Sequence, residues 1–146
     1  VGTLRSAGRD VAILPFDPRS KTCYLLGNCE AAMAKVLRRA YDALPAGRIV
    51  VVTGNLHAMR QGPTDPNSAF AGKTPMTAYL HDLDPVTIDI AAERGQFWAC
   101  QEVDACGVVT ISRARPGGRQ PDDAPYDYRL VLPAFTPIRQ VGDTDR

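Results

Sequence analysis

The sequence predicts an α/β fold with a mostly parallel sheet, flanking helices and additional β-strands in the C-terminal third. The main observation is a helical pattern at residues 28–47 that lies between two apolar runs, at 10–17 and 48–54. A strand, a helix and a strand joined by tight connections form a βαβ unit, so the two strands should be parallel with a right-handed crossover. Further apolar runs after residue 85 predict the additional strands.

The first part of the chain supplies the expected βαβ unit. Residues 10–17, "DVAILPFD", predict a short buried strand that ends at Pro15 and Asp17. Residues 28–47 predict a helix with Asn28 as its N-cap, because apolar residues recur at spacings of three and four: Met33, Val36, Leu37, Ala40 and Leu44. Residues 48–54, "RIVVVTG", do not alternate with polar residues and therefore predict a strand buried on both faces.

The second part begins with a long Gly/Pro-rich loop at 58–73 and a short helix at 74–83. Residues 85–91 alternate apolar and polar side chains, which is typical of a half-buried strand. The remaining segments are predicted as strands at 96–100, 107–112 and 126–133, a polar loop at 113–125 and a frayed tail at 138–146. Residues 1–146 together are expected to form a single α/β domain.

Composition excludes several classes of protein. An apolar fraction of 45% and a charged fraction of 23% are those of a folded domain rather than a disordered chain. A net charge of +1 offers no electrostatic basis for binding nucleic acid. The apolar runs are too short to span a membrane, so we expect a soluble protein. A small molecule or a peptide is the expected ligand. Its oligomeric state is not predicted.

The start of the chain, "VGTLRSAG", has neither an initiator methionine nor a signal sequence. We therefore expect the chain to be the C-terminal part of a larger domain, with further residues upstream of Val1.

Four cysteines form two pairs with the same spacing, Cys23 with Cys29 and Cys100 with Cys106. This spacing differs from the usual C-x2-C of zinc sites, and neither histidine is near a pair, so disulfides and buried free thiols are the main alternatives. Disulfides would place the protein outside the cell or in the periplasm, whereas free thiols would place it in the cytoplasm.

The candidate site lies where the two strands of the βαβ unit would end. Parallel strands end at the same edge of a sheet, which would bring Asp17, Asn55 and His57 together where α/β proteins bind ligands. His57 has the chemistry of a general base, Asn55 can donate to an oxyanion, and Asp17 can orient the imidazole or bind a metal. Arg60 can hold an anionic group. The alternative is that Asn55 and His57 only cap a turn and bond to backbone.

These residues also carry a family resemblance. The segments "VVVTGNLHAMR" (50–60), "TPMTAYL" (74–80) and "GQFWAC" with the later "CG" resemble the ChaN-like, erythromycin-esterase-like superfamily, which includes the Tiki and TraB proteins. Only Gly54, Asn55 and His57 match its shared Gly-Asn-x-His motif, and "EAAMA" (30–34) is similar to the start of a family helix. Family members have an earlier strand with a Glu/His signature. Either this strand lies upstream of Val1, which the missing initiator methionine favours, or this protein lacks it.

The resemblance implies a ligand site at the carboxyl edge of the sheet and several alternative activities. In a hydrolase-type site, His57 activates water for ester or peptide hydrolysis, Asn55 stabilises the oxyanion, and Asp17 or Glu30 orients the base or binds a metal. Gly54, Arg60 and Glu30 are the candidate ligand-binding residues. The alternative is a non-catalytic module that binds a small ligand or haem. A divalent metal or haem are thus the candidate cofactors.

Overall fold

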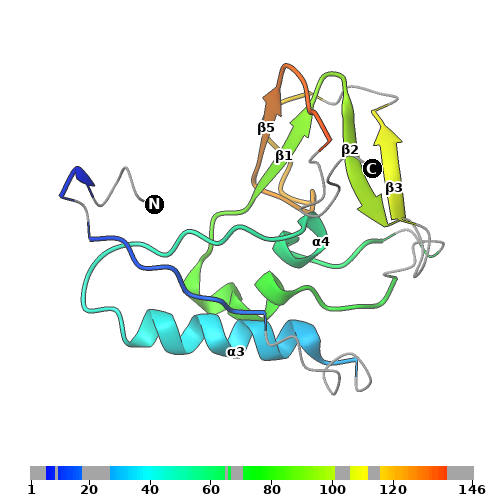
Figure 1. The fold of residues 1–146 in the computed structure, drawn as a ribbon. Helices are drawn as coiled ribbons and strands as arrows, with labels where there is room; N and C mark the ends of the chain where they lie inside the picture. Colours follow the sequence, from blue (N-terminus) through cyan, green and yellow to red (C-terminus); the bar gives the residue numbers. More distant parts are fainter. Residues whose placement is uncertain are drawn as a thin grey trace. The chain divides into compact units, whose positions relative to one another are not determined.

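The computed structural model describes residues 6–8, 10–17, 27–64, 66, 71–100, 106–111 and 116–137. The chain divides into two compact units, residues 1–52 and 53–146. Among the described residues the first unit contains the longest helix, and the second contains shorter helices and all the strands (Figure 1). That both units belong to one domain stays a prediction, and the expected tail at 138–146 lies outside the described residues.

The first unit contains the predicted helix, α3 (Cys29–Asp42). Its apolar stripe is the buried side, with Met33, Ala34 and Leu37 almost fully covered. Glu30 in the first turn and Arg39 in the last turn complement the helix dipole. The helix ends at Asp42, before the expected residue 47, because the N–H of Ala43 donates to the carbonyl of Arg39 and the N–H of Leu44 closes a tighter turn onto the carbonyl of Tyr41.

The two strands expected beside this helix are absent. Residues 10–17 and 48–54 are described, and none of them belongs to a strand. Val50 and Val52 are each 86% exposed, so the run that was expected to be buried on both faces lies largely in solvent. The physical reason is that β-branched residues favour an extended backbone but form a strand only when a neighbour satisfies their N–H and C=O groups. The βαβ prediction is therefore wrong.

The strands all belong to the second unit and form two small sheets. In the first sheet the order is β1 (Ile88–Ala92), β5 (Tyr128–Leu132) and β4 (Gly118–Arg119). Strand β1 is parallel to β5 (Figure 1), and β4 is antiparallel to β5. The second sheet pairs β2 (Gln96–Cys100) with β3 (Cys106–Thr110) in an antiparallel ladder. The strands expected at 85–91, 96–100, 107–112 and 126–133 are thus confirmed, while β4 falls within the expected loop 113–125.

These sheets correct the predicted fold class. In the described residues, β1–β5 is the only ladder of parallel strands, and few helices accompany the two sheets. The chain therefore does not have a mostly parallel sheet with flanking helices. The prediction depended on two parallel strands at 10–17 and 48–54, and neither exists.

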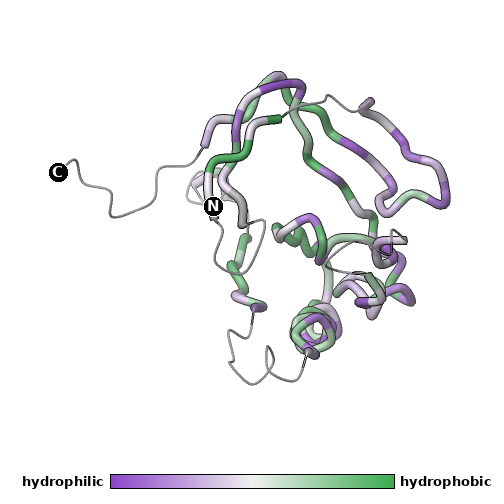
Figure 2. Tube along the Cα trace, turned by 90° about the vertical axis from the view of Figure 1, so that its right-hand side faces the viewer, coloured by the Kyte–Doolittle hydropathy of each residue, from purple (hydrophilic) through white to green (hydrophobic). Residues whose placement is uncertain are grey.

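The β1–β5 ladder is covered on its charged face. The alternation of apolar and polar residues correctly predicts β1, but Ile88 and Ile90 are 53% and 56% exposed while Thr87 is buried. On the covered face the Arg129 guanidinium pairs with Asp89 at 2.8 Å, and these side chains are only 11% and 12% exposed. Figure 2 likewise shows hydrophobic stretches on extended parts of the chain as well as on helices. Alternation predicts a strand without telling which face is covered.

A corner joins β1 to β2 at Gly95. The backbone there has a φ of +111°, and a side chain would collide with the carbonyl oxygen of Phe135. The N–H of Gln96 donates to that same oxygen at 3.1 Å. Glycine is therefore required where the chain leaves the first sheet and enters the second.

Cys29 takes part in a disulfide, and no cysteine in the described part of the chain is free. Cys100 and Cys106 lie directly opposite each other at the end of the β2–β3 ladder, whereas Cys23 lies outside the described residues. The disulfide alternative is therefore the one supported at Cys29. No helix in the described residues has the length and apolar character needed to cross a membrane.

Because the ion pair of Asp89 with Arg129 is buried, we expect removal of one partner to lower the stability of the fold strongly. Asp89→Ala leaves the Arg129 charge covered and unpaired, so we expect the free energy of unfolding to fall by roughly 3 kcal/mol. The matched control is Asp122→Ala, because Asp122 faces Arg119 at 3.7 Å with side chains 96% and 76% exposed. Such a pair contributes about 0.5 kcal/mol or less. Urea unfolding of both variants measures the difference, and equal losses would contradict the structural role of the buried pair.

Candidate functional site

His57 lies on a single turn of helix, α4 (Asn55–Ala58), with Gly54 as its N-cap. The sequence analysis expected it to follow a buried strand, and this expectation is wrong because residues 48–54 form no strand. The chain that leaves α4 runs directly into Arg60 and Gln61, whose side chains bind a distant loop. The position of His57 therefore depends on contacts with other elements of the second unit.

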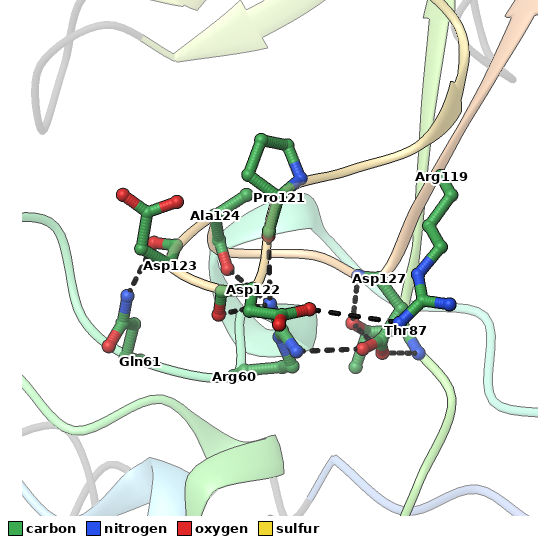
Figure 3. A network of polar contacts seen from close by, with 9 residues as sticks. All are labelled: Arg60, Gln61, Thr87, Arg119, Pro121, Asp122, Asp123, Ala124 and Asp127. Carbon is green, nitrogen blue, oxygen red and sulfur yellow. Dashed lines mark hydrogen bonds and ion pairs between the residues drawn. The ribbon is translucent and has the colours of Figure 1, made fainter.

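The strongest of these contacts is made by Arg60 (Figure 3). Its Nη2 donates to the carbonyl oxygens of Asp122 at 3.0 Å and Ala124 at 2.7 Å, with a longer contact of 3.5 Å to Pro121. Its backbone N–H donates to the carbonyl of Pro125 at 2.8 Å. Gln61 adds a bond from Nε2 to the carbonyl of Asp123 at 2.8 Å. Residues 121–125 thus turn their carbonyl oxygens toward the segment that follows α4.

Asp127 connects this cluster to the first sheet. One carboxylate oxygen, Oδ1, pairs with Nη1 of Arg60 at 2.9 Å. The other, Oδ2, accepts bonds of 2.7 Å from both the backbone N–H and the hydroxyl of Thr87, just before β1. We call Arg60, Gln61, Thr87, Asp127 and the carbonyls of residues 121–125 the Arg60 network. It ties α4, the loop before β5 and the start of β1 into one arrangement.

The same contacts set the ionisation of Asp127. Burial raises the pKa of this carboxyl, but the backbone and side-chain bonds from Thr87 and the charge of Arg60 outweigh burial. The result is a pKa below the ordinary value of 3.8. Asp127 is therefore held as a carboxylate, the form that accepts all of these bonds.

The side chains of the Gly-Asn-x-His motif are arranged locally. Oδ1 of Asn55 accepts the N–H of Leu56 at 3.0 Å, which leaves the two Nδ2 hydrogens of this exposed residue available to a ligand. The His57 imidazole folds back over Gly54, where a Cβ would lie 3.5 Å from Cδ2 and 3.9 Å from Nε2. A side chain at position 54 would therefore lie against the half-buried ring of His57.

The predicted site residues separate into two groups. Gly54, Asn55, His57 and Arg60 lie within seven residues of one another in the second unit, whereas Asp17 and Glu30 belong to the first unit. Asp17 was expected beside His57 at a common sheet edge, but the strands that would form this edge are absent from residues 10–17 and 48–54. Arg60, expected to bind an anionic ligand, uses Nη1 and Nη2 within the Arg60 network.

The described residues do not offer a metal site. No group of three or more His, Cys, Asp or Glu side chains gathers among them in a way that could hold a metal ion.

The chain matches no protein-family model, no curated protein and no solved structure. The resemblance to the ChaN-like superfamily therefore stays a prediction that depends on the Gly54-Asn55-x-His57 motif.

The residues that hold α4 are those that sequence reasoning missed. Thr77 donates from its hydroxyl to the carbonyl of His57 at 3.0 Å, and Tyr126 donates to the carbonyl of Asn55 at 2.8 Å. These partners are 20 and 71 residues apart, so no local pattern connects them. For the Arg60 network the sequence offered one chemical signal, because Thr87 and Asp127 are polar residues placed immediately beside apolar strands.

The depressed pKa of Asp127 predicts how stability depends on pH. The pKa of Asp127 is lower in the folded protein than in the unfolded chain. Its contribution to stability is therefore complete at pH values above the pKa of the unfolded chain, and it is lost as the pH falls through the pKa of the folded protein. We expect the wild type to exceed Asp127→Asn in free energy of unfolding at about pH 6, and the gap to shrink toward about pH 2. Urea unfolding measures the gap, and Asp123→Asn serves as the exposed control. A gap that widens on acidification would contradict the role of the carboxylate.

The fork of the Arg60 guanidinium predicts that lysine cannot replace it. Arg60→Lys keeps a positive charge near Asp127 but loses the planar donors to the carbonyls, so we expect a loss of about 2 kcal/mol of stability. Amide hydrogen exchange should also quicken at residues 54–60 and 121–127. The control, Arg119→Lys, changes an exposed pair and should cost about 0.5 kcal/mol at most. Equal losses in the two variants would show that the charge alone matters.

Proposed function

We propose that the second unit carries a hydrolase-type site in which His57 activates water for hydrolysis of an ester or a peptide. The observation that carries this proposal is the way in which the turn α4 is held in place by residues distant in the sequence. The bonds that fix the turn use the backbone carbonyls of Asn55 and His57 and the side chain of Arg60. These bonds hold the backbone of the turn from which the side chains of Asn55 and His57 extend.

The proposed reaction begins when the imidazole of His57 takes a proton from water. The resulting hydroxide attacks the acyl carbon, and the carbonyl oxygen becomes an oxyanion that accepts a hydrogen bond from Nδ2 of Asn55. Collapse of this intermediate expels the alkoxide or amine, which takes the proton back from the imidazolium. The products are a carboxylic acid and an alcohol or amine.

Two features of the turn support these roles. The bond from Leu56 N–H holds Oδ1 of Asn55, so the amide presents its donors rather than its acceptor to a substrate. Gly54 places no side chain against the imidazole, whereas a Cβ at this position would contact the ring. The proposal does not depend on Asp17 or Glu30, which lie in the first unit.

We also propose that the protein works in an oxidising compartment. Disulfides persist outside the cell and in the periplasm, whereas cytoplasmic reductants keep thiols reduced. The disulfide at Cys29 supports this placement.

The test is hydrolysis of a panel of small aryl esters and fluorogenic peptides, with and without added divalent cation. His57→Ala should lower kcat/KM by about a hundredfold or more, since general-base catalysis contributes on that order. Asn55→Ala should cost about a hundredfold. The matched control is His81→Ala, because His81 is exposed and its Nδ1 contacts only the carbonyl of Ala78 in its own turn.

Two outcomes would overturn the proposal. One is a wild-type protein that hydrolyses no member of the panel, and the other is His57→Ala with undiminished activity and an unchanged circular dichroism spectrum. In the first case a haem titration decides the alternative: a Soret shift that disappears in His57→Ala would assign the site to haem binding.

A further inference from the structure

The turn that carries His57 is too short to hold its own conformation. Isolated helices need about 12 residues or more to be even marginally stable, and α4 has four. A helix also leaves its last four carbonyls without a partner inside the helix. For α4 these carbonyls make up the whole helix, so they need donors that lie outside it.

Each carbonyl from Gly54 to His57 nevertheless has a donor. The carbonyls of Gly54 and Leu56 accept backbone N–H groups of the same segment, from His57 at 3.1 Å and Met59 at 3.4 Å. The carbonyls of Asn55 and His57 accept side-chain hydroxyls instead, from Tyr126 at 2.8 Å and Thr77 at 3.0 Å. The two residues of the proposed site are thus the two whose backbone is held by hydroxyl groups.

The hydroxyl donors are themselves fixed by their surroundings. Tyr126 is 4% exposed and adjoins Asp127, whose carboxylate is bound by Arg60 and Thr87. Thr77 is 8% exposed and lies in the helix η1 (Met76–Leu83), between the buried residues Met76 and Leu80. The donors come from two different elements, and neither can follow a shift of α4 without moving a packed part of the unit.

We infer that Tyr126 and Thr77 are positioning residues that set the orientation of Asn55 and His57 through their backbone carbonyls. Neither hydroxyl is assigned a contact with substrate. The inference rests on the proposed function for its effect on catalysis, and its effect on the His57 ring can be measured without any substrate. A displacement of a catalytic group by about 1 Å can lower a rate by up to about a hundredfold.

The experiment compares variants that differ by one hydroxyl. Tyr126→Phe and Thr77→Val delete the donors, Thr77→Ser keeps a hydroxyl at position 77, and Tyr79→Phe removes an exposed hydroxyl from η1 as a control. We expect kcat to fall about tenfold or more in Tyr126→Phe and Thr77→Val, with KM within about twofold of wild type. Thr77→Ser and Tyr79→Phe should stay within about twofold in both constants.

The second readout is the NMR signal of the His57 ring, followed as the pH is varied. The chain has only two histidines, so His81 provides an internal reference. The ring shift and titration of His57 should change in Tyr126→Phe and Thr77→Val but not in Thr77→Ser or Tyr79→Phe. A merely structural role would lower stability while kcat of the folded fraction and the His57 titration stayed as in wild type, and this result would overturn the inference.

The two proposals can fail separately. If the wild type hydrolyses nothing, the proposed function fails, whereas the NMR comparison still decides whether the hydroxyls position His57. If Tyr126→Phe does not fold, the comparison of Thr77→Val with Thr77→Ser carries the test, because the two variants differ by the hydroxyl and a methyl group.

Discussion

The second unit depends on the Arg60 guanidinium and on what it binds. Its Nη2 donates to the carbonyl oxygens of Pro121, Asp122 and Ala124, and its Nη1 pairs with the carboxylate of Asp127. Through Asp127 the same cluster reaches Thr87 and so fixes where β1 begins. A planar cation with several donors suits this task, since a loop that turns its carbonyls inward needs donors that its own backbone does not supply. In the described residues, no buried side-chain nitrogen or oxygen is left without a partner.

The candidate site is an outcome of this network rather than a separate feature. The turn at α4 lies between the N-cap Gly54 and Arg60, so anchoring Arg60 restricts where the turn can go. Hydroxyls from Thr77 and Tyr126 then fix the carbonyls of the two motif residues. Rigid backbone with functional side chains at its surface is the arrangement that catalytic and binding sites require. The motif of three residues thus depends on partners spread over much of the unit.

Sequence reasoning succeeded where the signal was local. The apolar stripe of 28–47 predicted α3, and short β-branched or aromatic runs predicted β2, β3 and β5. It failed at 48–54 because β-branched composition indicates an extended backbone, while a strand also needs a partner that composition does not reveal. For Arg60, charge alone suggested an anion site. The carbonyls that occupy it lie more than 60 residues away, and no local pattern encodes that contact.

The ion pair of Asp89 with Arg129 restricts the register in which β1 can pair with β5. The exposed face of β1 and β5 carries the apolar side chains of Ile88, Ile90, Tyr128 and Leu130, and apolar contacts of this kind are less demanding of one alignment than a charge pair is. On the covered face, each step of sliding would separate the two charges and leave both without water or a counterion. The ion pair, formed between residues 40 positions apart, therefore selects a single alignment of the only parallel ladder in the described strands. The ion pair therefore contributes more to the choice of one strand register than to the free energy of folding.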